Sequence, residues 1–362
     1  MAFKANKSEW SELYVFLRLL TDGKLYLGNH RGEKSERSFW PISVIEREEH
    51  DGPRRYYIEE DKVRVEGKED YIKLHRVALA VMADKVLDLI KSNNEEEIEC
   101  PEDIEKFLDT AKILYLEPET QDRTDLKISF WSPHKIPTGF IIQSKLAPMR
   151  PLLDGGRSAN LKLELTGARK FAQPEIENIN ALETNETVRD RMLLIQEMDG
   201  VLRYSDVADR VFRCNLSMID LHFARILAEM VRTFHIEGKS RVYEVMNIIK
   251  KENPIKIKED LIQKHRFYEY KMKQFLMAAT CGMRPAKIFN GEDSAVEGML
   301  VVGSEGQIIG YHKDERKAFE DFLYLNTRFI KGSQEKDKYG FLEREHGTYF
   351  FKLNVKIGLT KR

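Results

Sequence analysis

The chain has 362 residues, of which 42% are apolar and 33% are charged. This composition excludes an intrinsically disordered chain and predicts one large or two medium globular domains. The 59 basic and 60 acidic residues nearly cancel, to a net charge of −1. Any nucleic-acid site must therefore be a local patch and not a property of the whole chain.

Only three cysteines occur, Cys100, Cys214 and Cys281, and none belongs to a C-x-x-C pair. That pattern argues against a disulfide framework and against a structural zinc held by cysteines. The first residues, MAFKANKSEW, contain no apolar signal segment, and no apolar run is long enough to cross a bilayer. We therefore expect a soluble, cytoplasmic protein with no membrane partner.

Two helices and a strand region are predicted in the first hundred residues. Residues 7–21 carry apolar side chains at helical spacing, and Asn6 with Glu9 three positions later forms a capping box. In residues 54–66 apolar and polar side chains alternate, as they do in a β-strand. Residues 76–93 are rich in Ala, Val and Leu and predict a second helix.

The periodicity changes between residues 110 and 166. Short β-prone runs there read KILYL, DLKISFW, GFIIQSKL and NLKLELTG, and turns with Pro, Gly and Asp separate them. A long helical stretch is predicted over about 175–280, with an interruption at Asn253-Pro254.

The last part of the chain returns to strands. Residues 298–312 predict a hairpin around Ser304-Glu-Gly306, residues 314–326 a helix, and the final YFFKLNVKIGL a strand region. The order of elements predicts a mixed α/β chain without βαβ regularity.

The stretch DLKISFWSPHKIPTGFIIQSK, residues 125–145, sets an aspartate at the start of one β-like run and a Gln-x-Lys at the end of the next. Mg²⁺-dependent hydrolysis of a phosphodiester needs carboxylate or amide oxygens that hold the ion and leave room for water and substrate. Asp125 and Gln143 could supply such oxygens. Lys145 lies on the strand face of Gln143 and could orient or deprotonate the water. On residue statistics alone, a solvated carboxylate at a strand start explains Asp125 better, and a polar strand face explains the other two equally well.

Glutamates offer further acidic ligands. Glu12 on the first helix has no local explanation, whereas the capping box already accounts for Glu9. Glu164, in LKLEL, alternates with Lys162 and fits an exposed strand face better.

Two basic stretches stand out locally. Residues 145–170 hold six basic residues against two acidic ones, and residues 256–273 hold six against three, with aromatic residues between them. Arg157 and Asn160 follow a Gly-Gly turn, where the backbone can approach a ligand closely, and these side chains suit the edges of guanine and adenine. A solvated face is the ordinary explanation of such runs. Two of them in a nearly neutral chain favour phosphate contact.

Several other enzyme classes lack their motifs. No H-x-x-x-H or H-E-x-x-H spacing occurs, which argues against a zinc enzyme. The histidines considered were His134, His235, His265, His312 and His346. The chain also lacks G-x-x-x-x-G-K-[ST], G-x-G-x-x-G and G-x-S-x-G sequences, so ATPase, Rossmann and α/β-hydrolase functions have no support.

Unusual blocks follow one another along the whole chain. They read NKSEWSELYVFLRLLTDGKLY, TGFIIQSKLAPMRPLLDGGRSAN, NLSMIDLHFARILAEM, YKMKQFLMAATCGMRPAKIFNGEDSAVEGMLVVGSEGQIIGYH, FEDFLYLNTRF and YFFKLNVKIGL. Together these blocks resemble the HpaII family of type II restriction endonucleases nearly from end to end. Several ordered blocks in one chain are far more specific than any one short motif.

The resemblance implies a PD-(D/E)XK-type nuclease, with a core sheet flanked by helices and with additional helical and β segments. It implies cleavage of duplex DNA at a short site with Mg²⁺ as cofactor. Asp125 would then be the metal-binding aspartate and Glu12 a helix-borne acid, with Gln143 as a further metal ligand and Lys145 assisting the nucleophile. Arg150, Arg157 and Asn160 are the candidate phosphate or base contacts.

The resemblance also implies partners. A companion DNA methyltransferase would protect the host genome, and a homodimer would match a palindromic site, although a monomer stays open. We expect residues 1–170 to form the nuclease core and residues 171–362 to complete the fold and contact DNA, unless the two form one domain.

Two departures from the family pattern stand out. Family members usually read F-S-I-K-S where this chain has residues 140–144 as FIIQS, so Gln143 occupies the lysine position. Lys145 could replace that lysine from the same strand face. A Ser/Thr-rich segment ending in Ser-Arg-His is replaced after Asn326-Thr327 by KGSQEKDKYG, so the recognition sequence could differ from CCGG.

Two hypotheses follow for the function. The first is a Mg²⁺-dependent, site-specific DNA endonuclease. The alternative is a non-cleaving or methylation-dependent DNA-binding protein on a nuclease scaffold, and Gln143 in the lysine position is its main support.

Overall fold

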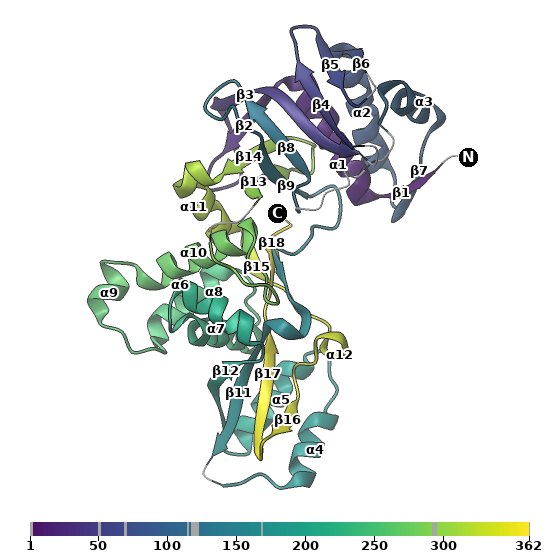
Figure 1. Ribbon diagram of the computed structural model, residues 1–362. Helices are drawn as coiled ribbons and strands as arrows, with labels where there is room; N and C mark the ends of the chain where they lie inside the picture. Colours follow the sequence, from purple (N-terminus) through teal and green to yellow (C-terminus); the bar gives the residue numbers. More distant parts are fainter. Residues whose placement is uncertain are drawn as a thin grey trace. The chain divides into compact units, whose positions relative to one another are not determined.

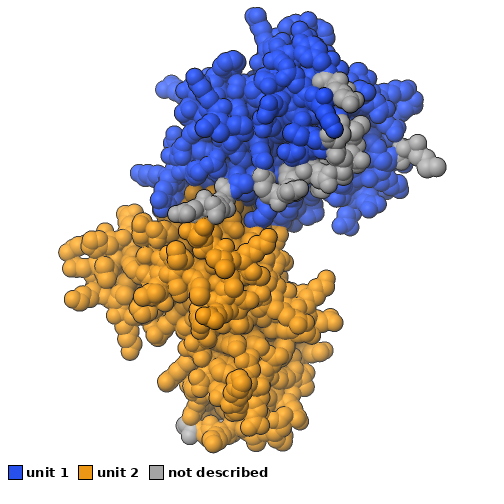
Figure 2. Space-filling model, in the orientation of Figure 1, with its two compact units in different colours: residues 1–150, 294–322, 361 blue, residues 151–293, 323–360, 362 orange. Residues whose placement is uncertain are grey.

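The computed structural model describes residues 3–49, 52–68, 71–113, 116, 123–167, 169–291 and 295–361. The chain divides into two compact units (Figure 2). Unit 1 comprises residues 1–150, 294–322 and 361, and unit 2 comprises residues 151–293, 323–360 and 362. The division at residue 170 made from the sequence differs from this one, because residues 294–322 return to the first unit. The roles assigned to the two parts stay a prediction.

A nine-stranded sheet forms the centre of unit 1, in the order β2-β14-β13-β9-β8-β3-β4-β5-β6 (Figure 1). Its strands are β2 (Lys24–Gly28), β3 (Lys34–Glu49), β4 (Gly52–Ile58), β5 (Lys62–Glu66), β6 (Tyr71–His75), β8 (Leu126–Phe130), β9 (Thr138–Ser144), β13 (Val296–Val302) and β14 (Ile308–His312). Strand β9 pairs antiparallel with β8 and parallel with β13. Because β9 and β13 lie far apart in the sequence, the centre of the sheet depends on long-range pairing.

Helices of unit 1 bury their apolar faces in one core. They are α1 (Lys7–Asp22), α2 (Arg76–Ser92) and α3 (Glu102–Ala111). The 3₁₀ turn η2 (Lys313–Glu315) leads into α11 (Arg316–Asn326), whose residues from Leu323 onward are counted with unit 2. The capping box at the start of α1 is confirmed, since Asn6 accepts from Glu9 N at 3.1 Å and Glu9 Oε2 accepts from Asn6 N at 2.6 Å. Trp10 and Leu17 of α1 share the core with Ile142 of β9 and Leu300 of β13, so α1 is fixed against the middle of the sheet. A short pair, β1 (Lys4–Asn6) with β7 (Glu97–Glu99), flanks it.

Unit 2 combines helices with two small sheets. The four-stranded sheet β12-β11-β17-β16 contains β12 (Gly200–Val207), β11 (Asn160–Gly167), β17 (Thr348–Asn354) and β16 (Leu342–Glu345). The three-stranded sheet β10-β18-β15 contains β10 (Leu153–Asp154), β18 (Lys356–Leu359) and β15 (Thr327–Phe329). The helical elements are η1 (Gly156–Ala159), α4 (Gln173–Ala181), α5 (Thr187–Glu197), α6 (Arg210–Ile219), α7 (Phe223–Glu237), α8 (Val242–Glu252), α9 (Glu259–Gln263), α10 (Phe267–Cys281) and α12 (Gln334–Asp337).

The mixed α/β class is confirmed, as are the helix over residues 76–92 and the hairpin β13–β14. The continuous helical stretch predicted over 175–280 is wrong at β12. There Leu202 and Val207 are buried because β12 pairs with β11, a partner that the local sequence does not reveal. The predicted run 54–66 is a hairpin of two strands. In the predicted run 112–116, residues 114 and 115 lie outside the described residues, and residues 112 and 113 are not in a strand.

No helix in the described part of the chain combines the length and the apolar character needed to span a membrane.

Candidate active site

Asp125 stands immediately before β8, and its side chain extends the pairing between β8 and β9. Its backbone N–H donates to Phe140 O at 2.8 Å, and its Oδ2 accepts from Ile142 N at 2.6 Å. The carboxylate thus takes the place of a backbone carbonyl at the strand end, and the residue is only 8% exposed. Asp125 is therefore a buried acid in a fixed position and not a solvated one.

Close approach of the neighbouring strands helps to hold that position. A Cβ on Gly139 of β9 would lie 2.4 Å from Thr124 Cγ2 and 2.0 Å from Ala295 O. Only glycine fits between these groups without a shift of the backbone. Thr124 directly precedes Asp125, so this contact fixes the segment that carries the carboxylate.

Glu12 comes from α1 and is brought to Asp125 through Arg150. The residue is 6% exposed on the buried helix. Arg150 Nη2 forms an ion pair with Glu12 Oε1, and Arg150 Nη1 lies 3.4 Å from Asp125 Oδ1. One guanidinium thus contacts two carboxylates from distant segments of the sequence, and we call these three residues the acidic cluster.

Burial and the neighbouring charges act in opposite directions on the acidic cluster. Burial raises the pKa of the Asp125 carboxyl, while the Arg150 charge, the Ile142 N–H and the Arg123 charge act in the opposite direction. Burial also lowers the pKa of Arg123, which feels both Asp125 and Arg150. Arg150, with about half of its side chain exposed, thus contacts both buried carboxylates, and Arg123 adds a second positive charge near Asp125.

Gln143 lies on β9, whereas Lys145 comes directly after the strand, so the shared face expected for the two side chains stays a prediction. Gln143 is 3% exposed, and its Oε1 is buried with no hydrogen-bond partner among the described residues. Lys145 follows the strand, and its N–H donates to Val302 O at 2.9 Å. Within the described residues its ammonium forms no ion pair, and burial lowers its pKa. The structure thus gathers Glu12, Asp125 and Arg150 directly, whereas the Gln143 oxygen and the Lys145 ammonium have no partner in the described chain.

An open groove of about 790 Å³ lies beside the acidic cluster in unit 1. It is lined by the start of α1 and by residues 145–150, among other residues. A small hollow next to it is lined by Ser11, Glu12 and Ser144, and Ser11 Oγ is buried without a hydrogen-bond partner in the described chain. Sequence reasoning missed Ser11 and Arg123, because neither belongs to a recognisable motif.

The donor set suits a hard divalent cation. Two carboxylates and one unsatisfied amide oxygen are the ligand types that Mg²⁺ and Ca²⁺ prefer. Arg150 already places a cationic group between Glu12 and Asp125. Glu12 and Asp125 therefore offer ligands of the type expected for Mg²⁺, while no contact in the described chain joins Gln143 to them.

The three predicted DNA contacts have different surroundings. Arg150 belongs to the acidic cluster and keeps about half of its side chain exposed. Arg157, in η1 of unit 2, is exposed and donates from Nε to Lys336 O at 3.3 Å. Asn160 is 2% exposed, and its Nδ2 donates to Asp337 O at 2.7 Å. Asn160 thus ties β11 to the α12 region.

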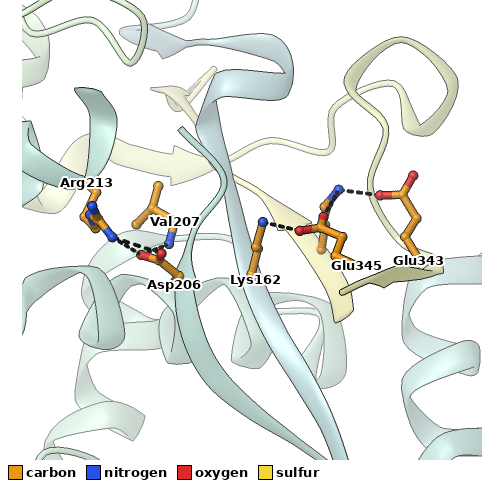
Figure 3. A network of polar contacts seen from close by, with 7 residues as sticks. Lys162, Asp206, Val207, Arg213, Glu343 and Glu345 are labelled. Atoms are coloured by element: carbon orange, nitrogen blue, oxygen red, sulfur yellow. Dashed lines mark hydrogen bonds and ion pairs between the residues drawn. The ribbon is translucent and has the colours of Figure 1, made fainter. Parts of the chain in front are cut away.

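Several charges of the basic stretches have acidic partners. Lys162 pairs with Glu345 on the four-stranded sheet (Figure 3). Lys271, in the second basic stretch, lies 3.4 Å from Asp220. These residues contribute less free positive charge to phosphate binding than the sequence indicates.

The comparisons with known proteins place the chain in the class of restriction endonucleases. The family model described as HpaII restriction endonuclease matches residues 6–359. The chain belongs to the HpaII restriction endonuclease family, which confirms the resemblance seen in the sequence blocks. It is 29% identical over 364 residues to the type II restriction enzyme HpaII of Haemophilus parainfluenzae, covering 98% of each chain. No solved structure matches this chain.

Proposed function

We propose that the protein is a type II restriction endonuclease that hydrolyses phosphodiester bonds of double-stranded DNA at a short specific site, with Mg²⁺ as cofactor. The observation that carries the proposal is the acidic cluster, in which Glu12 and Asp125 are buried around one guanidinium beside an open groove. Burying acids in this way lowers the stability of the fold, and such groups are found more often at catalytic sites than elsewhere.

Asp125, Glu12 and Gln143 would hold the Mg²⁺. When bound, the ion supplies positive charge that stabilises the pentacovalent phosphate and makes a coordinated water more acidic. The three residues contribute oxygens from α1, from the start of β8 and from β9. Because two of these elements belong to the central sheet and the third packs on it, the oxygens are held by the core and not by loops.

Lys145 would assist the attacking water. Its lowered pKa follows from burial, which favours the neutral amine over the ammonium. A neutral Nζ can accept a proton from water, and a charged one can orient the water and stabilise the developing negative charge. Either role compensates for Gln143 in the position where the family usually has lysine.

Arg150 and Arg157 would contact the DNA backbone. Arg150 can move its exposed guanidinium from the carboxylates to the scissile phosphate once Mg²⁺ balances the acids. Asn160 is buried, so it would act by holding the turn of Arg157. A homodimer on a palindromic site and a companion DNA methyltransferase complete the proposal.

The direct test is digestion of plasmid DNA by the purified chain. We expect discrete fragments from unmethylated DNA with Mg²⁺ and none with EDTA. Lys145→Ala should remove cleavage while DNA binding, followed by gel shift, persists. Lys162→Ala is the matched control, because that lysine is held in an ion pair on the sheet of unit 2.

The second candidate, a non-cleaving or methylation-dependent DNA-binding protein, rests on Gln143 and on the unpaired state of Lys145 among the described residues. Gel shifts without fragments under all metal conditions would establish the non-cleaving form. Fragments from methylated plasmid only would establish the methylation-dependent form. Cleavage at the wild-type rate by Lys145→Ala would exclude the role proposed for this lysine.

A further inference from the structure

Two histidines that lie far apart in the sequence meet in unit 1. His134 lies in the turn after β8, where Phe130 N donates to His134 O at 2.6 Å. His312 ends β14, and Asp314 follows in η2. We call His134, His312 and Asp314 the histidine cluster. It is distinct from the acidic cluster, since Asp125 precedes β8 and His134 follows it.

The three side chains present potential ligand atoms to one point. His134 Nε2 lies 3.1 Å from Asp314 Oδ2, and His312 Nδ1 lies 3.9 Å from the same oxygen. One ligand atom from each residue can be chosen so that all three lie within 4.8 Å of one another. Ligands in a tetrahedral shell with bonds of 2.0–2.1 Å are separated by about 3.3 Å. The observed separations therefore need only small adjustments to enclose an ion.

The histidine rings are poorly satisfied by the protein itself. Their centroids lie 4.6 Å apart, and Trp40 lies edge-on to both rings. His312 is 1% exposed, and its Nε2 has no hydrogen-bond partner among the described residues. His134 Nε2 lies close to Asp314, but it too has no hydrogen-bond partner among the described residues. Two imidazoles in apolar surroundings without full hydrogen bonding are costly.

We propose that His134, His312 and Asp314 bind a transition-metal ion of the zinc type, at a site separate from that of Mg²⁺. Two imidazole nitrogens and one carboxylate oxygen favour Zn²⁺, Co²⁺ or Ni²⁺ over Mg²⁺, which prefers oxygen ligands alone. The exposed side of Asp314 leaves the fourth position to water. The ion would join the turn after β8 to the segment between β14 and α11.

The lone pair of His312 Nδ1 is already directed toward Asp314. It accepts the Asp314 N–H at 3.2 Å, which is a long hydrogen bond. A metal that takes this lone pair displaces only that weak interaction. His134 needs only its Nε2 lone pair, which faces the carboxylate oxygen.

The test is metal binding by the full chain after treatment with a chelator. Zn²⁺ and Co²⁺ are added separately, bound metal is counted by mass spectrometry after gel filtration, and affinity is measured by calorimetry. We expect one ion per chain and, for Co²⁺, the visible absorption of tetrahedral coordination. His134→Ala and Asp314→Asn should each weaken Zn²⁺ binding by tenfold or more.

Two controls separate this site from others. Asp125→Ala should bind Zn²⁺ as the wild type does, because it alters only the acidic cluster. His346→Ala removes an exposed histidine of unit 2 and should also have no effect. If the circular dichroism spectrum shows that His134→Ala is unfolded, the Zn²⁺ affinity of Asp314→Asn is the deciding measurement. This variant should fold, because the Asp314 side chain is half exposed. Equal Zn²⁺ affinity in the wild type and Asp314→Asn, or no bound Zn²⁺ and Co²⁺ in the wild type, overturns the proposal and leaves a histidine–aspartate contact alone.

Discussion

Charged side chains have different surroundings in unit 1 and in unit 2. In unit 2, Lys162 and Lys352 meet Glu343 and Glu345 in ion pairs on one face of the four-stranded sheet (Figure 3). In unit 1, the carboxylates of the acidic cluster are buried and share one guanidinium. The side chains of the unit 2 ion pairs are only 15–37% exposed, and each ammonium lies against a carboxylate. Burying charged groups opposes folding, and the acidic cluster marks the unit in which chemistry is expected.

The difference between the units is tested most directly by removing one acid from each. Asp125→Ala should lower the single-turnover cleavage rate on the order of 1,000-fold or more, because it removes a carboxylate proposed to hold the metal. Asp206→Ala in unit 2 removes the exposed partner of Arg213 and should change the rate by less than about twofold. DNA binding by Asp125→Ala, measured by gel shift, should persist. Equal loss of cleavage in both variants would contradict the distinction between the units.

A buried histidine gives unit 2 its own response to acid. Burial, with the charge of Lys331, lowers the pKa of His235 from 6.5 to about 4. Between these values the unfolded chain binds a proton that the folded chain does not. The free energy of unfolding therefore falls as pH drops from about 6.5 to about 4, by up to about 3 kcal/mol.

His235→Phe should flatten that dependence in urea unfolding at pH 7 and pH 5. The exposed His346→Ala should leave the wild-type slope unchanged. An unchanged slope in His235→Phe would assign the acid sensitivity to other groups.

Arg150 contacts both carboxylates of the acidic cluster, Glu12 and Asp125. Arg150→Gln should lower cleavage by about 10- to 100-fold, because it removes the proposed contact with the phosphate. The same change should tighten Ca²⁺ binding several-fold in calorimetry, because the guanidinium no longer competes for Glu12 and Asp125. Arg213→Gln in unit 2 is the matched control for both measurements. Weaker Ca²⁺ binding by Arg150→Gln would show that the guanidinium does not compete with the metal.

The smallest expected effect is on the salt dependence of DNA binding, and it distinguishes two basic residues of unit 2. Arg157→Ala should weaken DNA binding and reduce the slope of log affinity against log salt by about 1, as expected for one phosphate contact. Lys162→Ala should leave the slope unchanged, since Glu345 already neutralises this lysine. Equal slopes in the two variants would remove Arg157 from the interface.

The sequence predicted the parts of the site that depend on local patterns. The capping box placed the start of α1, and with it Glu12 on a helix. The strand runs placed Asp125 before β8 and put Gln143 on β9. The burial of Gln143 was not predictable, because it depends on β13, a strand from a distant part of the sequence that pairs with β9.

Long-range contacts also explain what the sequence missed. Arg150 was expected at DNA, and its contact with Glu12 became visible only once α1 was packed against β9. His134 and His312 have no motif spacing because they belong to distant parts of the chain, yet the sheet order brings β8 and β14 to the same core. The segments flanking residues 200–207 favour a helix, so the sequence predicted a helical region there. Pairing with β11 outweighs that preference and makes these residues strand β12.

The parallel pairing of β9 with β13 has a consequence for synthesis of the protein. Residues 151–293, all of them in unit 2, are translated between these two strands. The sheet of unit 1 cannot be completed until β13 and β14 have left the ribosome, so its early segments wait with an open edge beside β9. A nascent or truncated chain ending before residue 296 therefore lacks the neighbour of Gln143. Under the function proposed above, such a fragment lacks part of the sheet that carries the site, so premature termination would not release an active nuclease.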